Sequence, residues 1–140
     1  DTSSLRWNTT GITIAGVTNQ FGNASNKLNS PFGLALDYSN TLYIADRHNH
    51  RVQKYLRDAS FGETIAGQKT GLYGANSSFL SYPTDLTVET NGDIYVCDGN
   101  NHRIQLWTSG LTSGVTVAGI GKSIVNTSYS FLKRFFYNLL

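Results

Sequence analysis

The amino-acid sequence predicts an all-β protein assembled from repeated four-stranded antiparallel units. Asn, Ser, Thr, Gly, Tyr and the β-branched residues Val and Ile dominate the composition, which favours strands and turns over helices. A string of similar residues returns about every 52 positions along the chain. Within each repeat, short apolar runs alternate with turn-forming residues. Together these three observations predict the fold class.

The repeat is visible in two kinds of segment. The string GITIAG at 11–16 returns as GETIAG at 62–67 and as GVTVAG at 114–119. Residues 31–56 align without a gap on residues 83–108. The identical pairs are Pro31/Pro83, Leu34/Leu86, Tyr43/Tyr95, Asp46/Asp98, Asn49/Asn101, His50/His102, Arg51/Arg103 and Gln53/Gln105. Chance does not produce so many identities in one register, so we expect two copies of one structural unit.

Each unit divides into four expected strands. The expected strands of the first unit are 32–38, 42–45, 50–56 and 64–66, and those of the second are 84–90, 93–98, 102–108 and 115–118. The runs 42–45 and 94–97 are apolar on both faces, as in a strand that is covered by a sheet on each side. Four antiparallel strands that recur every 40–50 residues are typical of the blades of a β-propeller.

The sequence resembles the NHL-repeat family. The resemblance rests on LYIADRHNHRVQKY, its copy IYVCDGNNHRIQLW, the preceding Pro-x-x-Leu and the closing T-[IV]-A-G. It implies a propeller, usually of six blades, and a partial one here: an NHL propeller segment at 1–132 with full blades at about 31–67 and 83–119. Residues 11–16 are expected to be the last strand of a preceding blade. Residues 133–140 leave the pattern and form a C-terminal tail.

One group of polar residues is expected to be structural, because it occurs in every unit whereas a ligand site tends to occur once. Its members are Asp46, His50, Arg51, Gln53, Asp98, His102, Arg103 and Gln105. Asp and Asn suit the turn between the second and third strands. Arg51 and Arg103 can pair with Asp46 and Asp98, or with Asp37 and Glu89 on the neighbouring strand.

The residues that differ between the units indicate a binding surface. Because successive strands run in opposite directions, the turn between the second and third strands and the loop between blades must share one face. That face should carry the long loops 17–30 and 68–82. The candidate binding residues are Arg47, His48, Asn49, Asn100, Asn101, Phe21, Leu72, Tyr73, Lys27 and Lys69. Variable loops on a rigid scaffold are typical of a recognition module.

We therefore expect a binding module for a protein partner, within a larger protein. NHL propellers also include RNA-binding ends of ubiquitin-ligase-like proteins and a zinc-dependent amidating lyase, so RNA binding and an enzyme fragment are the alternatives. The net charge of +2, from 11 basic and 9 acidic residues, is small for a nucleic-acid binder. His50 and His102 occupy equivalent positions in different blades, too far apart to share a zinc ion. No metal, cofactor or catalytic residue is predicted, and Cys97 aligns with Ala45 as a small buried residue.

The chain is also expected to be incomplete as a propeller. It contains no Met, which indicates excision from a longer product, and no apolar run is long enough to cross a membrane. Two blades leave two outer faces open, with apolar residues at positions such as Leu36, Leu42, Ile44 and Val52. Further blades or self-association are needed to cover these faces.

Overall fold

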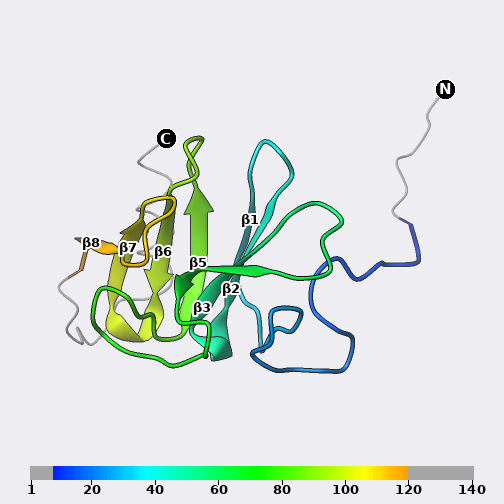
Figure 1. Cartoon of the computed structure of the whole chain (residues 1–140), viewed down its shortest axis with the longest axis horizontal. Coiled ribbons are helices and arrows are strands. Elements are labelled where there is room, and N and C mark those ends of the chain that lie inside the picture. The colour runs from blue at the N-terminus through cyan, green and yellow to red at the C-terminus, as the bar shows by residue number, and fades with distance from the viewer. Residues whose placement is uncertain (1–7, 120–140) are drawn as a thin grey trace.

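A computed structural model describes residues 8–119, and in this range the chain forms two four-stranded antiparallel sheets (Figure 1). The first sheet, blade 1, has the order β1-β2-β3-β4, and the second, blade 2, has the order β5-β6-β7-β8. The strands are β1 (Leu34–Leu36), β2 (Leu42–Asp46), β3 (Arg51–Tyr55), β4 (Glu63–Gly67), β5 (Pro83–Val88), β6 (Ile94–Asp98), β7 (Arg103–Trp107) and β8 (Val115–Ala118). The all-β class and the four-stranded antiparallel units predicted from the sequence are confirmed.

The two blades have the same register, as the repeat requires. Tyr43 pairs with Lys54 across β2 and β3, and Tyr95 pairs with Leu106 at the equivalent place in blade 2. Both sheets carry an irregularity between equivalent residues of the third strand, between Val52 and Gln53 in blade 1. The observed strands are one to four residues shorter than several of the expected ones, chiefly β1, because the chain leaves the ladder where Asp37 begins the turn to β2.

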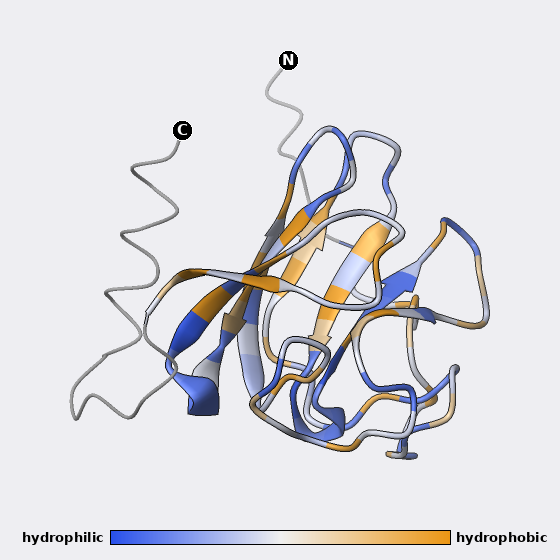
Figure 2. Cartoon of the chain, turned by 60° about the vertical axis from the view of Figure 1, so that its left-hand side comes forward, coloured by the Kyte–Doolittle hydropathy of each residue, from blue (hydrophilic) through white to orange (hydrophobic). Residues whose placement is uncertain are grey.

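The core lies between the two sheets. Alternate residues of blade 1 face blade 2, and alternate residues of blade 2 face back. The cluster contains Tyr43, Ala45, Val52, Ala66, Leu80, Leu86, Ile94, Val96 and Trp107. Figure 2 shows apolar segments along the strands of both sheets and hydrophilic residues at many of the turns. The blades lie close together at Gly33, since a Cβ there would lie 2.7 Å from the Cα of Asp85.

The connections between strands lie at two opposite ends of each blade. Short 3-10 turns, η1 (Arg47–Asn49) and η2 (Gly99–Asn101), join the second strand to the third in each blade. Backbone hydrogen bonds attach the long loops to these turns, from His48 to Asn29 and from Asn100 to Ser81. We call this end, made of η1, η2 and the loops 17–30 and 68–82, the loop face. The turns 37–41, 56–62, 89–93 and 108–114 form the opposite hairpin face (Figure 1).

Residues 11–16 are assigned no strand, and the expectation that they form the last strand of a preceding blade stays a prediction. A strand needs a partner for its backbone N–H and C=O groups, and none of the described residues forms a ladder with this segment. Gly16 nevertheless has the same positive φ, +83°, as the equivalent Gly67 at +78°. Residues 120–132 of the expected propeller segment and the tail 133–140 lie outside the described residues.

The face of blade 1 that points away from blade 2 is partly open. Leu86 of β5 is 5% exposed because blade 1 covers it, whereas Leu34, the equivalent residue of β1, is 67% exposed. Leu36 is also exposed. Ile44 and Val52 were expected among the apolar residues of the open faces, and this is wrong because both are buried. The Val52 side chain points toward blade 2 and belongs to the core.

Candidate functional site

The repeated polar motif forms a buried ion pair in each blade. In blade 1, Arg51 Nε donates to Asp46 Oδ2 at 2.8 Å, and the two side chains are 2% and 0% exposed. Asp46 also accepts hydrogen bonds from the backbone N–H of Asn29 and from the side-chain amide of Asn49. Each carboxylate oxygen therefore has a donor, which compensates for the burial of its charge.

The rest of the Arg51 guanidinium holds the interblade loops. Nη1 donates to the carbonyl oxygens of Asn23 at 2.7 Å and Lys69 at 3.4 Å. Nη2 donates to those of Ala24 and Lys27, both at 3.0 Å. A single buried side chain thus fixes the backbone of loop 17–30 and touches the start of loop 68–82. These loops are long but held in place, which is a requirement for a preorganised binding surface.

Blade 2 repeats this arrangement closely. Arg103 Nε donates to Asp98 Oδ2 at 2.8 Å. Its Nη atoms donate to the carbonyl oxygens of Ala75, Asn76 and Phe79 at 2.7, 2.9 and 3.2 Å. The arginines therefore pair with the aspartates at the end of the second strand, and they also bind loop carbonyls that the sequence pattern did not indicate.

Asn49 and Asn101, which the sequence placed among the candidate binding residues, both make structural hydrogen bonds. The Asn49 amide donates to Gly22 O at 2.7 Å and to Asp46 at 2.8 Å, and the residue is buried. The Asn101 amide makes the same two bonds, to Gly74 O and Asp98. Both side chains are occupied in holding the loops and belong with the structural motif. Their identity in the two repeats was the signal for this role.

His50 ends η1 in a left-handed conformation, with φ +52°, and His102 does the same in blade 2. The His50 ring is buried, and its Nδ1 accepts a hydrogen bond from the backbone N–H of Tyr82 at 3.1 Å. Burial, with a smaller contribution from the nearby His48, lowers the pKa of His50. A neutral imidazole is the form that can accept this bond.

A cluster of cationic and aromatic side chains surrounds His50 on the loop face. The Arg47 Cζ lies 5.5 Å from the ring centroid of Tyr82 and 5.6 Å from that of Phe32. Tyr82 also contacts the rings of His48 and His50, at 5.5 and 4.5 Å between centroids. We call the set Phe32, Arg47, His48, His50, Tyr73 and Tyr82 the Arg47 cluster, since Tyr73 packs on His50 at 5.2 Å.

Sequence reasoning missed Phe32 and Tyr82. These aromatic residues lie next to Pro31 and Pro83, where the chain passes from the interblade loop into the first strand. Their positions are not equivalent in the repeat, so alignment of the two units did not bring them together. The fold does so, because the Tyr82 of one unit lies above the turn η1 of the preceding unit.

The remaining candidate binding residues lie on or beside the loop face. Phe21, Leu72 and Tyr73 are exposed, at 79%, 61% and 69%. Lys69 and Asn100 are exposed as well, and Lys27 is half-buried. The backbone carbonyls of Lys27 and Lys69 both accept from Arg51, so the two loops converge at these lysines.

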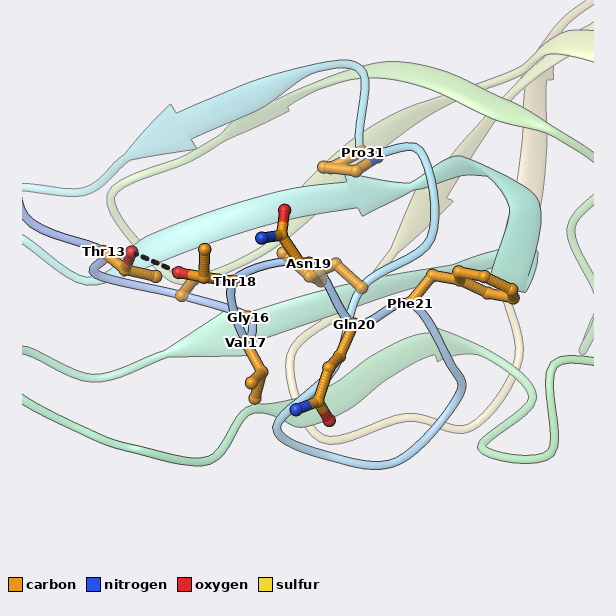
Figure 3. Close-up of a pocket in the computed structure, with 10 residues that line it drawn as sticks. Thr13, Gly16, Val17, Thr18, Asn19, Gln20, Phe21 and Pro31 are labelled. Atoms are coloured by element: carbon orange, nitrogen blue, oxygen red, sulfur yellow. Dashed lines mark hydrogen bonds between the residues drawn. The ribbon is translucent and has the colours of Figure 1, made fainter.

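A groove of about 500 Å³ lies beside loop 17–30 (Figure 3). Its lining includes Thr13, Asn19, Phe21, Leu28 and Pro31. The hydroxyl oxygens of Thr13 and Thr18 are 3.3 Å apart at its edge. One wall is the segment 13–18, which overlaps the expected strand of a preceding blade, so the shape of the groove depends on what covers this side of blade 1.

No group of three or more His, Cys, Asp or Glu residues that could hold a metal ion occurs within residues 8–119. In the same range, no helix has the length and apolar character needed to cross a membrane. The Cys97 thiol is buried, and burial together with the nearby Asp85 charge raises its pKa to about 12, which disfavours the thiolate form at neutral pH.

The geometry defines a class of protein. Two four-stranded antiparallel sheets of identical order pack face to face, and loop 68–82 joins the first to the second, as in consecutive blades of a β-propeller. The family model for the NHL repeat matches residues 28–55 and 80–106, which contain the buried Asp–Arg pair of each blade. The chain belongs to the NHL-repeat family.

Known relatives agree with this assignment. The chain is 31% identical over 121 residues to Protein brain tumor of Drosophila melanogaster, an alignment that covers 76% of the chain and 11% of that protein. It is 34% identical over 86 residues to NHL repeat-containing protein 2 of Homo sapiens and of Gallus gallus, covering 57% of the chain and 12% of each protein. The chain thus spans about a tenth of the length of these relatives.

Proposed function

We propose that this chain is the recognition segment of a larger protein and binds a protein partner on its loop face. The observation that carries the proposal is the combination of exposed Phe21, Leu72 and Tyr73 with loops that buried arginines hold in place. Exposed apolar side chains on a fixed backbone lose little conformational entropy on binding, so they favour association. Aromatic residues are also enriched at protein interfaces.

The proposal includes no catalytic role. The polar groups that recur in the blades are engaged in structural bonds: Asp46 and Asp98 bind their arginines, and His50 accepts a backbone N–H. The Cys97 thiol is buried with a raised pKa. These residues have structural partners and lack the free, convergent arrangement that acid–base or nucleophilic chemistry requires.

Site-specific photo-crosslinking tests the proposal. A photoreactive phenylalanine analogue is placed at Phe21 or Tyr73 on the loop face, and at Tyr38, which is 92% exposed on the hairpin face, as the matched control. We expect one discrete protein adduct from the loop-face positions in cell extract and none from Tyr38. Equal labelling from both faces, or no adduct from either loop-face position, contradicts the proposal.

RNA binding is the second candidate function. It is favoured by three basic residues, Lys27, Arg47 and Lys69, on a face that also exposes aromatic rings, because single-stranded bases stack on such rings. The same crosslinking experiment separates the two functions, since ribonuclease removes the mobility shift of an RNA adduct and leaves that of a protein adduct unchanged.

A further inference from the structure

Arg47 differs from the other arginines at the blade ends. Arg51 and Arg103 are buried and paired with carboxylates, whereas the guanidinium of Arg47 rests between the rings of Phe32 and Tyr82. Its Nε is shielded from solvent and has no hydrogen-bond partner among residues 8–119. Aromatic rings stabilise the cation and fix its plane, but they leave its N–H donors unused.

The loop face offers Arg47 no acidic partner of its own. Neither 17–30 nor 68–82 contains an Asp or Glu. Among the described residues, Asp46 and Asp98 at this end are buried with arginine partners. Asp85 of β5 lies beside Gly33, where its carboxylate accepts the backbone N–H of Leu86 and forms no ion pair with a described basic residue. The positive charges of Lys27, Arg47 and Lys69 are therefore not balanced on this face.

The hairpin face has the opposite character. Four acidic residues lie in its turns: Asp37, Asp58, Glu89 and Asp93. Its one basic residue in the described turns, Arg57, lies 3.8 Å from Asp58 with a side chain 77% exposed. Charge is thus separated along the blade axis although the chain as a whole is nearly neutral, which directs an acidic partner to the loop face.

The Arg47 position occurs once in the described blade pair. Its equivalent in blade 2 is Gly99, where a Cβ would lie 2.7 Å from the carbonyl oxygen of Tyr82 and 3.1 Å from the side chain of Thr84. No side chain fits there without displacing Tyr82, which is the residue that supports Arg47. The two blades therefore differ at the position of Arg47. Such a difference allows one blade to carry a site that the other lacks.

From these observations we propose that Arg47 binds a carboxylate of an acidic peptide segment of the partner, with Phe32, Tyr73 and Tyr82 contacting the apolar residues beside it. The proposal rests on the proposed function and names the chemistry of the partner. The two Nη atoms of the planar guanidinium match a carboxylate through two parallel hydrogen bonds, and the shielded Nε takes no part. Peptide is favoured over RNA because Leu72 and Phe21 extend the apolar surface, and because three unpaired basic residues are few for a phosphate backbone.

The test measures binding of fluorescein-labelled peptides to the full chain by fluorescence anisotropy at two salt concentrations. The probes are a Glu- and Tyr-containing decapeptide, the same peptide with Gln for Glu, and a labelled single-stranded RNA decamer. We expect the Glu peptide to bind at least about tenfold more tightly than the Gln peptide, and R47Q to lose about tenfold. R57Q removes the same charge from the hairpin face and should change nothing. Unchanged thermal melting of R47Q confirms its fold.

Each other outcome overturns the proposal. No preference for Glu over Gln, or equal losses in R47Q and R57Q, removes the role of Arg47. Tighter binding of RNA that depends on Arg47 assigns the site to nucleic acid instead. If crosslinking at Tyr73 is unaffected by R47Q, the acidic-peptide assignment fails but the recognition function stands. The two proposals therefore fail separately.

Discussion

Arg51 and Asp46 form a charge pair that is almost completely removed from solvent, and the Nε–Oδ2 distance of 2.8 Å is the same in the Arg103–Asp98 pair of blade 2. The motif that identifies the repeat in the sequence therefore connects the end of the second strand of a blade to the loop that precedes that blade. Because these bonds form only when the blade is folded, the conformation of the loop face depends on the folding of the blade.

Replacing Arg51 by Met should cost about 3–5 kcal/mol of unfolding free energy, because Asp46 is left buried without its charge partner and the carbonyl oxygens of loop 17–30 lose three hydrogen bonds. Urea denaturation measures the loss. Arg57→Met is the control, since its ion pair is exposed and should contribute less than about 1 kcal/mol. Similar losses in the two variants contradict a structural role for Arg51.

Replacing Gly67 by Ala should destabilise the protein by about 3 kcal/mol or more. Gly67 has φ +78°, and a Cβ would press against the carbonyl oxygen of His50. Gly110 is the matched control, because it has φ +85° and open space around it. Gly110→Ala should therefore lower the unfolding free energy by the backbone strain alone, about 1 kcal/mol. Thermal or urea unfolding of the two variants measures the difference, and an equal cost shows that the close approach is unimportant.

The Cys97 thiol gives a prediction for pH dependence. Its pKa is raised to about 12 in the folded chain, against about 8.5 for a free thiol. Between these values the unfolded chain releases a proton that the folded chain keeps, so the unfolding free energy should fall as pH rises above about 9, by up to about 1.4 kcal/mol per unit. Below pH 8 the thiol contributes no slope.

Urea titrations at several pH values test this, with Cys97→Ala as the control, since Ala45 occupies the equivalent position. The variant should lack the part of the slope that comes from the thiol. Rapid modification of Cys97 by a thiol reagent in the native state at pH 8 is the result that contradicts its burial.

The repeat predicted most of the fold, and the reason is physical. A blade must present equivalent residues to the blade on each side, so the 52-residue register constrains strand order and facing direction together. The expected strand at 11–16 is not seen among the described residues, because a sequence pattern specifies which residues favour a strand but not whether a partner strand is present. Asn49 was assigned to binding because a turn position suggested exposure, whereas its amide is used by Gly22 and Asp46.

The Arg47 cluster was only partly predictable. Arg47, His48 and Tyr73 were found as the variable residues of a common face. Phe32 and Tyr82 support them from positions that are far apart in the chain and different in the two repeats, and only the packing of β5 on blade 1 brings them together. Specific sites in repeat proteins arise where the symmetry is broken, and such places are the least visible to an alignment of the repeats.

The open face of blade 1 leads to the last prediction, that the chain associates with itself when no further blade is attached. Leu34 and Leu36 are exposed, while the equivalent residues of blade 2, Leu86 and Val88, pack against blade 1. At about 1.5–3 kcal/mol for each uncovered side chain, the two leucines forgo about 3–6 kcal/mol, a large part of the roughly 5–15 kcal/mol of a typical domain. Sedimentation or light scattering of residues 1–140 should therefore give a mass above that of the monomer. The double variant Leu34→Glu/Leu36→Glu should lower this mass, whereas Leu111→Glu, at an exposed leucine of the hairpin face, should not. A monodisperse wild-type monomer with a cooperative melt would show that this face needs no partner.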